Sequence, residues 1–127
     1  MSTQRVLVVE DVPELSQLLE VTFDFDERFT AVGVAADATR ALELASAEQP
    51  DAVVLDISID GESNDLLPRL VDLLPRARIV IFTGHDDPVR RETLLAAGAS
   101  AYVVKGGDLD VLLETLADGA SSPPPRP

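Results

Sequence analysis

Five short apolar runs alternate along the chain with longer stretches whose apolar residues recur at helical spacing. The short runs fall at residues 6–9, 29–35, 52–55, 79–82 and 101–104. Most are continuously apolar, which is typical of strands that are covered on both faces. The apolar stripes of the longer stretches fall at residues 15–23, 38–45, 66–74, 89–97 and 109–116. Five strand–helix units in succession predict an α/β fold in which a parallel sheet carries helices on both faces.

Local signals mark several of the expected helix ends. Pro13 suits the first turn of the first helix, and Asp37 is a suitable N-cap for the second. Pro75 and Gly98 follow the third and fourth stripes, where they would end those helices.

A chain of 127 residues has room for one domain of ordinary size. The alternation stops at Gly119, and the last residues are rich in proline. We therefore expect one domain at residues 1–118, followed by a disordered proline-rich tail or a linker stub at 119–127. A recognition peptide for a proline-binding partner is the alternative for this tail.

The chain contains no cysteine and no apolar run of 18 residues. The first feature excludes disulfides and thiolate metal sites and fits a reducing compartment. The second argues against a membrane span, and the N-terminus lacks the pattern of a secretory signal. These features predict a cytoplasmic protein without membrane attachment.

Acidic residues dominate the charge of the chain. Ten Lys and Arg residues stand against 23 Asp and Glu residues, for a formal net charge of −13. Direct binding of nucleic acid needs clustered cations, so we expect none from this chain. A negative field favours divalent cations and basic partner surfaces, although excess acid also keeps a small protein in solution.

Polar residues follow four of the five expected strands directly. They are Glu10 and Asp11 after the first strand, Asp56 after the third, Thr83 at the end of the fourth and Lys105 after the fifth. Because sites in open parallel sheets lie at the carboxyl ends of the strands, we expect these side chains to converge. Each also has a plainer interpretation: the carboxylates as helix caps, Thr83 as a strand end and Lys105 as a surface cation.

The expected group of side chains points to phosphoryl chemistry. Three neighbouring carboxylates repel unless a cation lies among them, and a hard ion such as Mg²⁺ prefers oxygen ligands. An ammonium and a hydroxyl group can hold a phosphoryl group, and one carboxylate can accept it as an aspartyl-phosphate.

Four segments together resemble the receiver domain of bacterial two-component response regulators. These segments are residues 6–11, 51–56, 81–84 and 97–105, and the resemblance extends from about Arg5 to Ala117. The resemblance implies a flavodoxin-like, doubly wound (βα)5 fold with five parallel strands in the order 2-1-3-4-5. It also implies a signalling domain rather than a metabolic enzyme.

The same resemblance assigns roles to the residues at the strand ends. Asp56 would accept a phosphoryl group from a histidine kinase, and Lys105 would pair with that group. Asp11 would ligate Mg²⁺ directly and Glu10 through a bound water, while Asp56 and the backbone carbonyl of Ser58 would complete the protein ligands.

Phosphorylation would then change a surface. Thr83 would swing toward the phosphoryl group and Tyr102 would follow inward. This movement would alter the face formed by the fourth helix (about residues 89–97), the fifth strand (101–104) and the fifth helix (about 109–116). Tyr102 packed as an ordinary strand aromatic is the alternative. The same face is the expected interface for an output domain, a downstream protein or a homodimer.

Some residues depart from the usual pattern of these domains. The loop Ile57–Asn64 lacks the usual Met-Pro and carries Asp60 and Glu62, which either tune the site or are exposed loop charges. Gly84 leaves access to the acceptor. Gly106 stands where many relatives have a cis proline, and a cis bond to a non-proline residue costs about 2.5–4 kcal/mol.

Two other function classes compete with the switch. One is a binding module of the same fold that works without phosphorylation, which the unusual loop after Asp56 motivates. The other is a Mg²⁺-dependent phosphohydrolase with an aspartate nucleophile. Such enzymes place an acidic residue two positions after the nucleophile, where this chain has Ser58.

Overall fold

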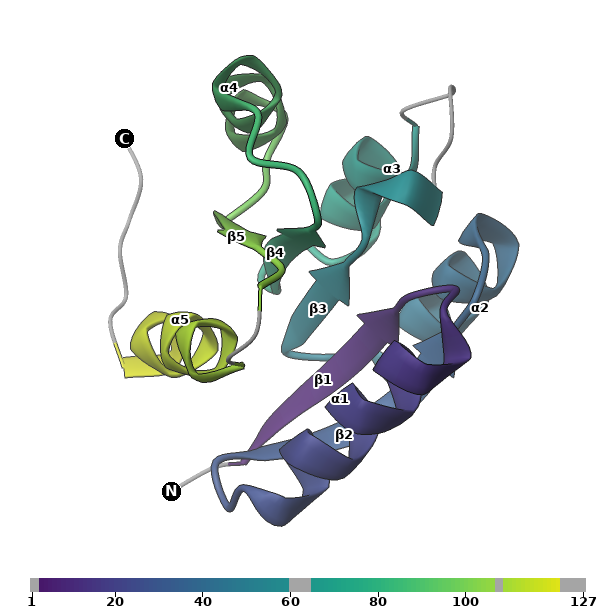
Figure 1. Ribbon diagram of the computed structural model, residues 1–127. Coiled ribbons are helices and arrows are strands. Elements are labelled where there is room, and N and C mark those ends of the chain that lie inside the picture. Colours follow the sequence, from purple (N-terminus) through teal and green to yellow (C-terminus); the bar gives the residue numbers. More distant parts are fainter. Residues whose placement is uncertain (1–2, 60–64, 107–108, 122–127) are drawn as a thin grey trace.

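The computed structural model describes residues 3–59, 65–106 and 109–121 (Figure 1). Five parallel strands form one sheet in the order β2-β1-β3-β4-β5. The strands are β1 (Gln4–Val9), β2 (Phe29–Ala35), β3 (Ala52–Leu55), β4 (Arg78–Thr83) and β5 (Ala101–Val104). The predicted bounds of β2, β3 and β5 are confirmed, and the strand order confirms the flavodoxin-like α/β fold.

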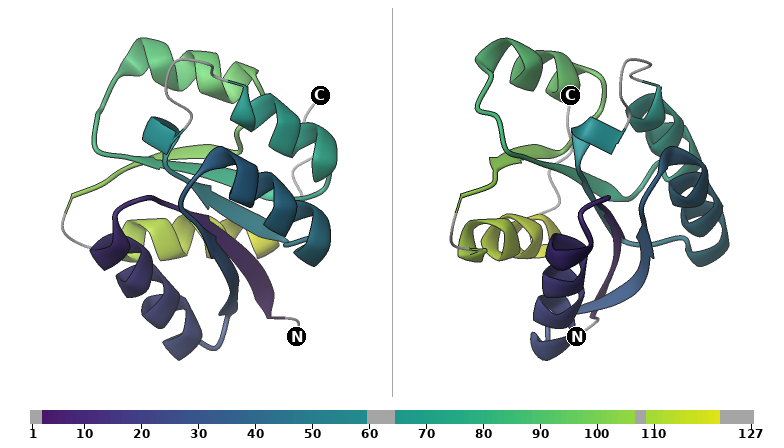
Figure 2. Two further views of the ribbon diagram at one scale, coloured as in Figure 1. Left: turned by 90° about the vertical axis from the view of Figure 1, so that its right-hand side faces the viewer. Right: turned by 45° about the vertical axis from the view of Figure 1, so that its right-hand side comes forward.

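Five helices alternate with the strands and cover both faces of the sheet (Figure 2). They are α1 (Pro13–Phe25), α2 (Ala38–Glu48), α3 (Leu66–Leu73), α4 (Pro88–Ala96) and α5 (Asp110–Ser121), with a short 3-10 helix η1 (Ile57–Ile59) after β3. Residues of α1 and α5 pack on one face, and residues of α2 and α3 pack on the other.

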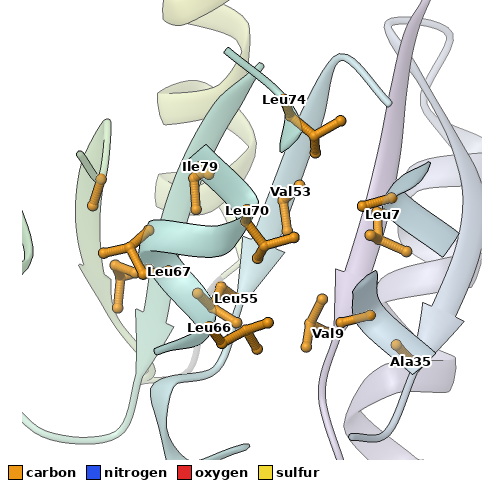
Figure 3. Close-up of a cluster of buried hydrophobic side chains, with 14 residues drawn as sticks. Leu7, Val9, Ala35, Val53, Leu55, Leu66, Leu67, Leu70, Leu74 and Ile79 are labelled. Atoms are coloured by element: carbon orange, nitrogen blue, oxygen red, sulfur yellow. The ribbon is translucent and has the colours of Figure 1, made fainter. Parts of the chain in front are cut away.

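The continuous apolar runs follow from this layering. In β1, Val6 and Val8 pack toward α1 and α5, whereas Leu7 and Val9 pack toward α2 and α3, and all four are fully buried. Figure 3 shows the cluster on the side of α2 and α3, in which leucines of α3 lie over side chains of β1 and β3. A strand that alternates between two buried faces needs apolar residues at every position.

The signals at the helix ends are confirmed. The first helix begins at Pro13, and the carboxylate of Asp37 accepts a hydrogen bond from the backbone N–H of Arg40 at 2.8 Å. Gly98 follows α4 with a φ of 119°, and a Cβ there would lie 2.7 Å from a methyl group of Val71. Only glycine fits this position without strain or collision.

Two of the predicted apolar stripes are partly wrong. In α1, Leu18 is exposed, and Ser16 instead joins Leu19 and Phe23 on the buried face. In α4 no residue is buried, and Val89, placed in the predicted stripe, is 75% exposed. The reason is that α4 packs beside the short edge strand β5, which offers little surface to cover.

The last helix runs to Ser121, past the end at residue 118 that the sequence pattern predicted. Residues 122–127 of the expected tail lie outside the described residues, so the domain boundary stays a prediction. None of the described helices combines the length and the apolar character needed to cross a lipid bilayer.

Candidate functional site at the carboxyl ends of the strands

The side chains of Glu10, Asp56 and Lys105 meet at the carboxyl edge of the sheet. The Lys105 Nζ atom lies 3.0 Å from Glu10 Oε1 and 3.3 Å from Asp56 Oδ2. Backbone hydrogen bonds place these residues, because the N–H groups of Glu10, Asp56 and Lys105 donate to the carbonyls of Ala35, Val9 and Thr83. The strand pairing therefore continues one residue beyond each strand and sets the position of each functional group.

Asp11 completes an acidic cluster with Glu10 and Asp56. One carboxylate oxygen from each of the three residues lies within 4.8 Å of the others. Glu10 and Asp56 are only 2% and 5% exposed, whereas Asp11 is exposed. Three carboxylates with a single ammonium group form a site of net negative charge that is open at Asp11.

Burial and pairing shift the pKa values of these groups in different directions. Burial raises the pKa of Glu10 above its ordinary value, despite the opposing effect of Lys105. Burial also acts to raise the pKa of Asp56, but hydrogen bonds from Ser58 and the charge of Lys105 outweigh it, so the pKa is lowered. For Lys105, burial lowers the pKa less than its acidic partners raise it. At neutral pH Asp56 is therefore a carboxylate and Lys105 an ammonium.

The capping interpretations hold only in part. Asp56 does act as a local cap, because its Oδ1 atom accepts a hydrogen bond from the backbone N–H of Ser58 at 3.0 Å, at the start of η1. The first helix has no side-chain cap; Glu10 Oε2 accepts from the N–H of Val12, which precedes that helix. Burial of two carboxylates goes beyond what capping requires, since caps normally remain exposed to water.

The donor atoms of the cluster fit a hard divalent cation. Carboxylate oxygens are the ligands that Mg²⁺ and Ca²⁺ prefer, and mutual repulsion of the three acids would be relieved by such an ion. Two ligand groups are nearly withdrawn from water, and the third is exposed, so an ion could keep part of its hydration shell.

Thr83 and Tyr102 both form hydrogen bonds with the loop between β4 and α4. Thr83 is 2% exposed, and its Oγ1 atom accepts a hydrogen bond from the N–H of His85 at 3.3 Å. Tyr102 is half-buried, and its hydroxyl group donates to the carbonyl of His85 at 2.8 Å. The two predicted switch residues are thus connected through the backbone of one residue, His85.

The departures from the usual sequence pattern have simple structural outcomes. The described residues contain no cis peptide bond, so Lys105–Gly106 is trans. Gly84 has open space where a side chain would begin, in agreement with an accessible edge. Asp60 and Glu62 lie outside the described residues.

Sequence reasoning missed Arg91, which is a neighbour of Tyr102. Its guanidinium carbon lies 5.1 Å from the centre of the Tyr102 ring. No sequence motif connects the two residues, because the contact arises only when α4 packs beside β5.

Comparison with known proteins agrees with the fold and the site. The family model of the response regulator receiver domain matches residues 6–117. The chain belongs to this family. It is therefore a receiver signalling domain of the two-component type rather than a classical enzyme, and the phosphohydrolase interpretation is wrong.

Individual relatives point the same way. The nitrate/nitrite response regulator protein NarP of Escherichia coli (strain K12) is 32% identical over 117 residues, which are 91% of this chain and 54% of that protein. A crystal structure of a LuxR-family response regulator from Aurantimonas sp. SI85-9A1 has 31% identity and a TM-score of 0.81, over 89% of this chain and 81% of that one.

A response regulator from Burkholderia pseudomallei, solved with a phosphorylated aspartic acid, a calcium ion and citrate, is 26% identical with a TM-score of 0.81. The match covers 93% of this chain and 69% of that one. Among the curated relatives, the chain spans about half of their length.

Proposed function

We propose that this domain accepts a phosphoryl group on Asp56 from a sensor histidine kinase and passes the signal on as a change of surface. The observation that carries the proposal is the placement of the Asp56 carboxylate. It lies within ion-pair distance of Lys105 and in one acidic cluster with Glu10 and Asp11.

The transfer is a displacement at phosphorus. A carboxylate oxygen of Asp56 forms a bond to the phosphorus of a phosphohistidine, the P–N bond breaks, and its electron pair stays on the imidazole. The lowered pKa of Asp56 keeps this nucleophile ionised at neutral pH. Lys105, whose ammonium already lies at 3.3 Å from that carboxylate, would pair with the new phosphoryl group.

The acidic cluster would hold Mg²⁺ through Asp11, Asp56 and the backbone carbonyl of Ser58, with Glu10 acting through a bound water. When bound, Mg²⁺ supplies positive charge that offsets the phosphoryl oxygens. The chain's own contribution is to hold the acids together: the Ser58 N–H fixes one oxygen of Asp56, and strand pairing fixes Glu10.

Thr83 and Tyr102 would transmit the change. A new group of about −1.5 to −2 charge attracts the Thr83 hydroxyl, which must then leave its hydrogen bond with the N–H of His85. Tyr102 follows, because the carbonyl of the same residue, His85, holds its hydroxyl group. The altered face comprises α4, β5 and α5.

The partners belong to the same proposal. The relatives are about twice as long, and several are transcriptional regulators by name. The α4–β5–α5 face would therefore contact an output domain, a downstream protein or a second copy. We assign no direct nucleic-acid contact to the receiver domain at residues 1–118, because its excess of acid opposes a polyanion. Because the proposed phosphodonor is a cytoplasmic kinase domain, the proposed location of this domain is the cytoplasm.

Phosphorylation of the intact chain tests the proposal. Acetyl phosphate with Mg²⁺ should add one phosphoryl group by intact-protein mass spectrometry, and Asp56→Asn should abolish the addition. Asp51→Asn, which changes an exposed acid at the opposite end of β3, is the matched control. An unmodified wild-type mass under conditions that label another receiver domain would refute the proposal and favour a binding module that needs no phosphorylation.

A further inference from the structure

Tyr102 is held from two sides by the segment between β4 and α4. Its hydroxyl group donates to the carbonyl of His85 at 2.8 Å. The guanidinium carbon of Arg91 lies 5.1 Å from the centre of the ring, within the range of a cation–π interaction. The Nη2 atom of Arg91 lies 3.3 Å from Asp86 Oδ1, so the loop also orients the guanidinium group.

The placement of Arg91 differs from that of an ordinary surface arginine. Its Nε atom is shielded from solvent and, among the described residues, donates no hydrogen bond. A shielded N–H without an acceptor is unfavourable, so other interactions must offset it. Stacking on the Tyr102 ring and pairing with Asp86 are the interactions that the structure provides.

This contact matters for α4 because apolar packing holds that helix weakly. None of its residues is buried, and Val89 and Leu95 are exposed. Arg91 thus connects α4 to the edge strand β5 through the side chain of Tyr102.

We propose that Arg91 is a positioning residue that holds Tyr102 half-buried before any phosphoryl group is present, and so sets how readily the α4–β5–α5 face switches. The coupling to switching rests on the proposed function. A contact that favours the held position of Tyr102 reduces the free energy that phosphorylation must supply to bring the ring inward. Loss of the contact should increase, about two- to fivefold, the population of molecules in which the Tyr102 ring has left its half-buried position. This factor is the one expected of a partly exposed cation–π pair.

The chain provides its own spectroscopic probe, since Tyr102 is the only tyrosine and tryptophan is absent. Acrylamide quenching of tyrosine emission should be stronger in Arg91→Gln than in the wild-type chain, with Asp86→Asn intermediate and Arg91→Lys close to wild type. Arg90→Gln is the matched control, because Arg90 is the preceding residue of α4 and lines the cavity between α3 and α4.

Equal quenching in wild type and Arg91→Gln, or an equal rise in Arg90→Gln, would overturn the positioning role. Circular dichroism verifies that each variant is folded; if Arg91→Gln is not, the comparison of Asp86→Asn with wild type decides in its place.

Beryllofluoride with Mg²⁺ separates this inference from the proposed function. In the wild type, beryllofluoride should reduce the quenching of Tyr102 emission. In Arg91→Gln, the beryllofluoride concentration at half-saturation should be higher, by up to the same two- to fivefold factor. Unchanged half-saturation together with stronger quenching in the ion-free variant would overturn the coupling to switching. A wild-type chain that does not respond to beryllofluoride would refute the proposed function, while the ion-free comparison would still decide the role of Arg91.

Discussion

Removal of the Lys105 ammonium should destabilise the ion-free protein strongly. Lys105 lies 3.0 Å from Glu10 and 3.3 Å from Asp56, and those residues are 2% and 5% exposed. Loss of one partner from a buried ion pair costs about 3–5 kcal/mol, and the 25% exposure of Lys105 reduces the expected loss to about 2–4 kcal/mol for Lys105→Met. For a domain of this size the melting temperature should fall by about 8–16 °C.

The loss should depend on pH in a defined direction. In the wild type, the Lys105 ammonium stabilises the folded state fully below the ordinary Lys pKa of 10.5, because the pKa of Lys105 in the folded state is raised. Lys105 lowers the pKa of both Glu10 and Asp56, so without it both acids should bind protons more readily as the pH falls. The deficit of Lys105→Met should therefore be largest near about pH 8 and shrink as the pH falls toward about 5.

Urea unfolding with a chelator present measures this free energy at each pH. Arg40→Met is the control, since Arg40 pairs with Glu43 on the surface of α2 and should cost at most about 0.5 kcal/mol. The double variant Glu10→Gln/Lys105→Met should regain part of the loss. A deficit no larger than that of Arg40→Met, or one that is independent of pH, would refute the assigned role of Lys105.

Three further predictions concern local structure. Gly98→Ala should cost about 1–3 kcal/mol in urea unfolding, because alanine is strained at positive φ and its Cβ would collide with Val71; a change within error would contradict the glycine requirement. Asp37→Ala should cost about 1 kcal/mol through the lost cap of α2, and Asp37→Asn should cost little by comparison. Asp26 has a lowered pKa, chiefly through its hydrogen bond with the Arg28 guanidinium, so its stabilisation is present above the ordinary pKa of 3.8 and disappears as the pH falls through the lower folded pKa. Asp26→Asn should therefore cost about 0.5 kcal/mol at neutral pH, discounted for the exposure of Arg28, and nothing in strong acid; a difference that persists in acid would exclude this ion pair as its source.

The sequence by itself determined the layers of this protein and the edge of the sheet that carries the site. Buried parallel strands require continuous apolar runs, so residues 52–55 and 101–104 could be read as strands with their correct ends. Polar residues directly after such runs must lie at the carboxyl edge, so the sequence alone predicts that Asp56 and Lys105 lie near one another.

Tertiary structure alone decided how individual side chains are partnered. Periodicity suggested that Leu18 and Val89 were buried, yet both are exposed, because burial depends on which neighbouring element covers a helix face. The periodicity of the sequence could not reveal the contact between Arg91 and Tyr102, or the opposite pKa shifts of Glu10 and Asp56. The physical reason is that secondary structure follows from local periodicity, whereas contacts and electrostatic shifts depend on distances between atoms that only the folded chain brings together.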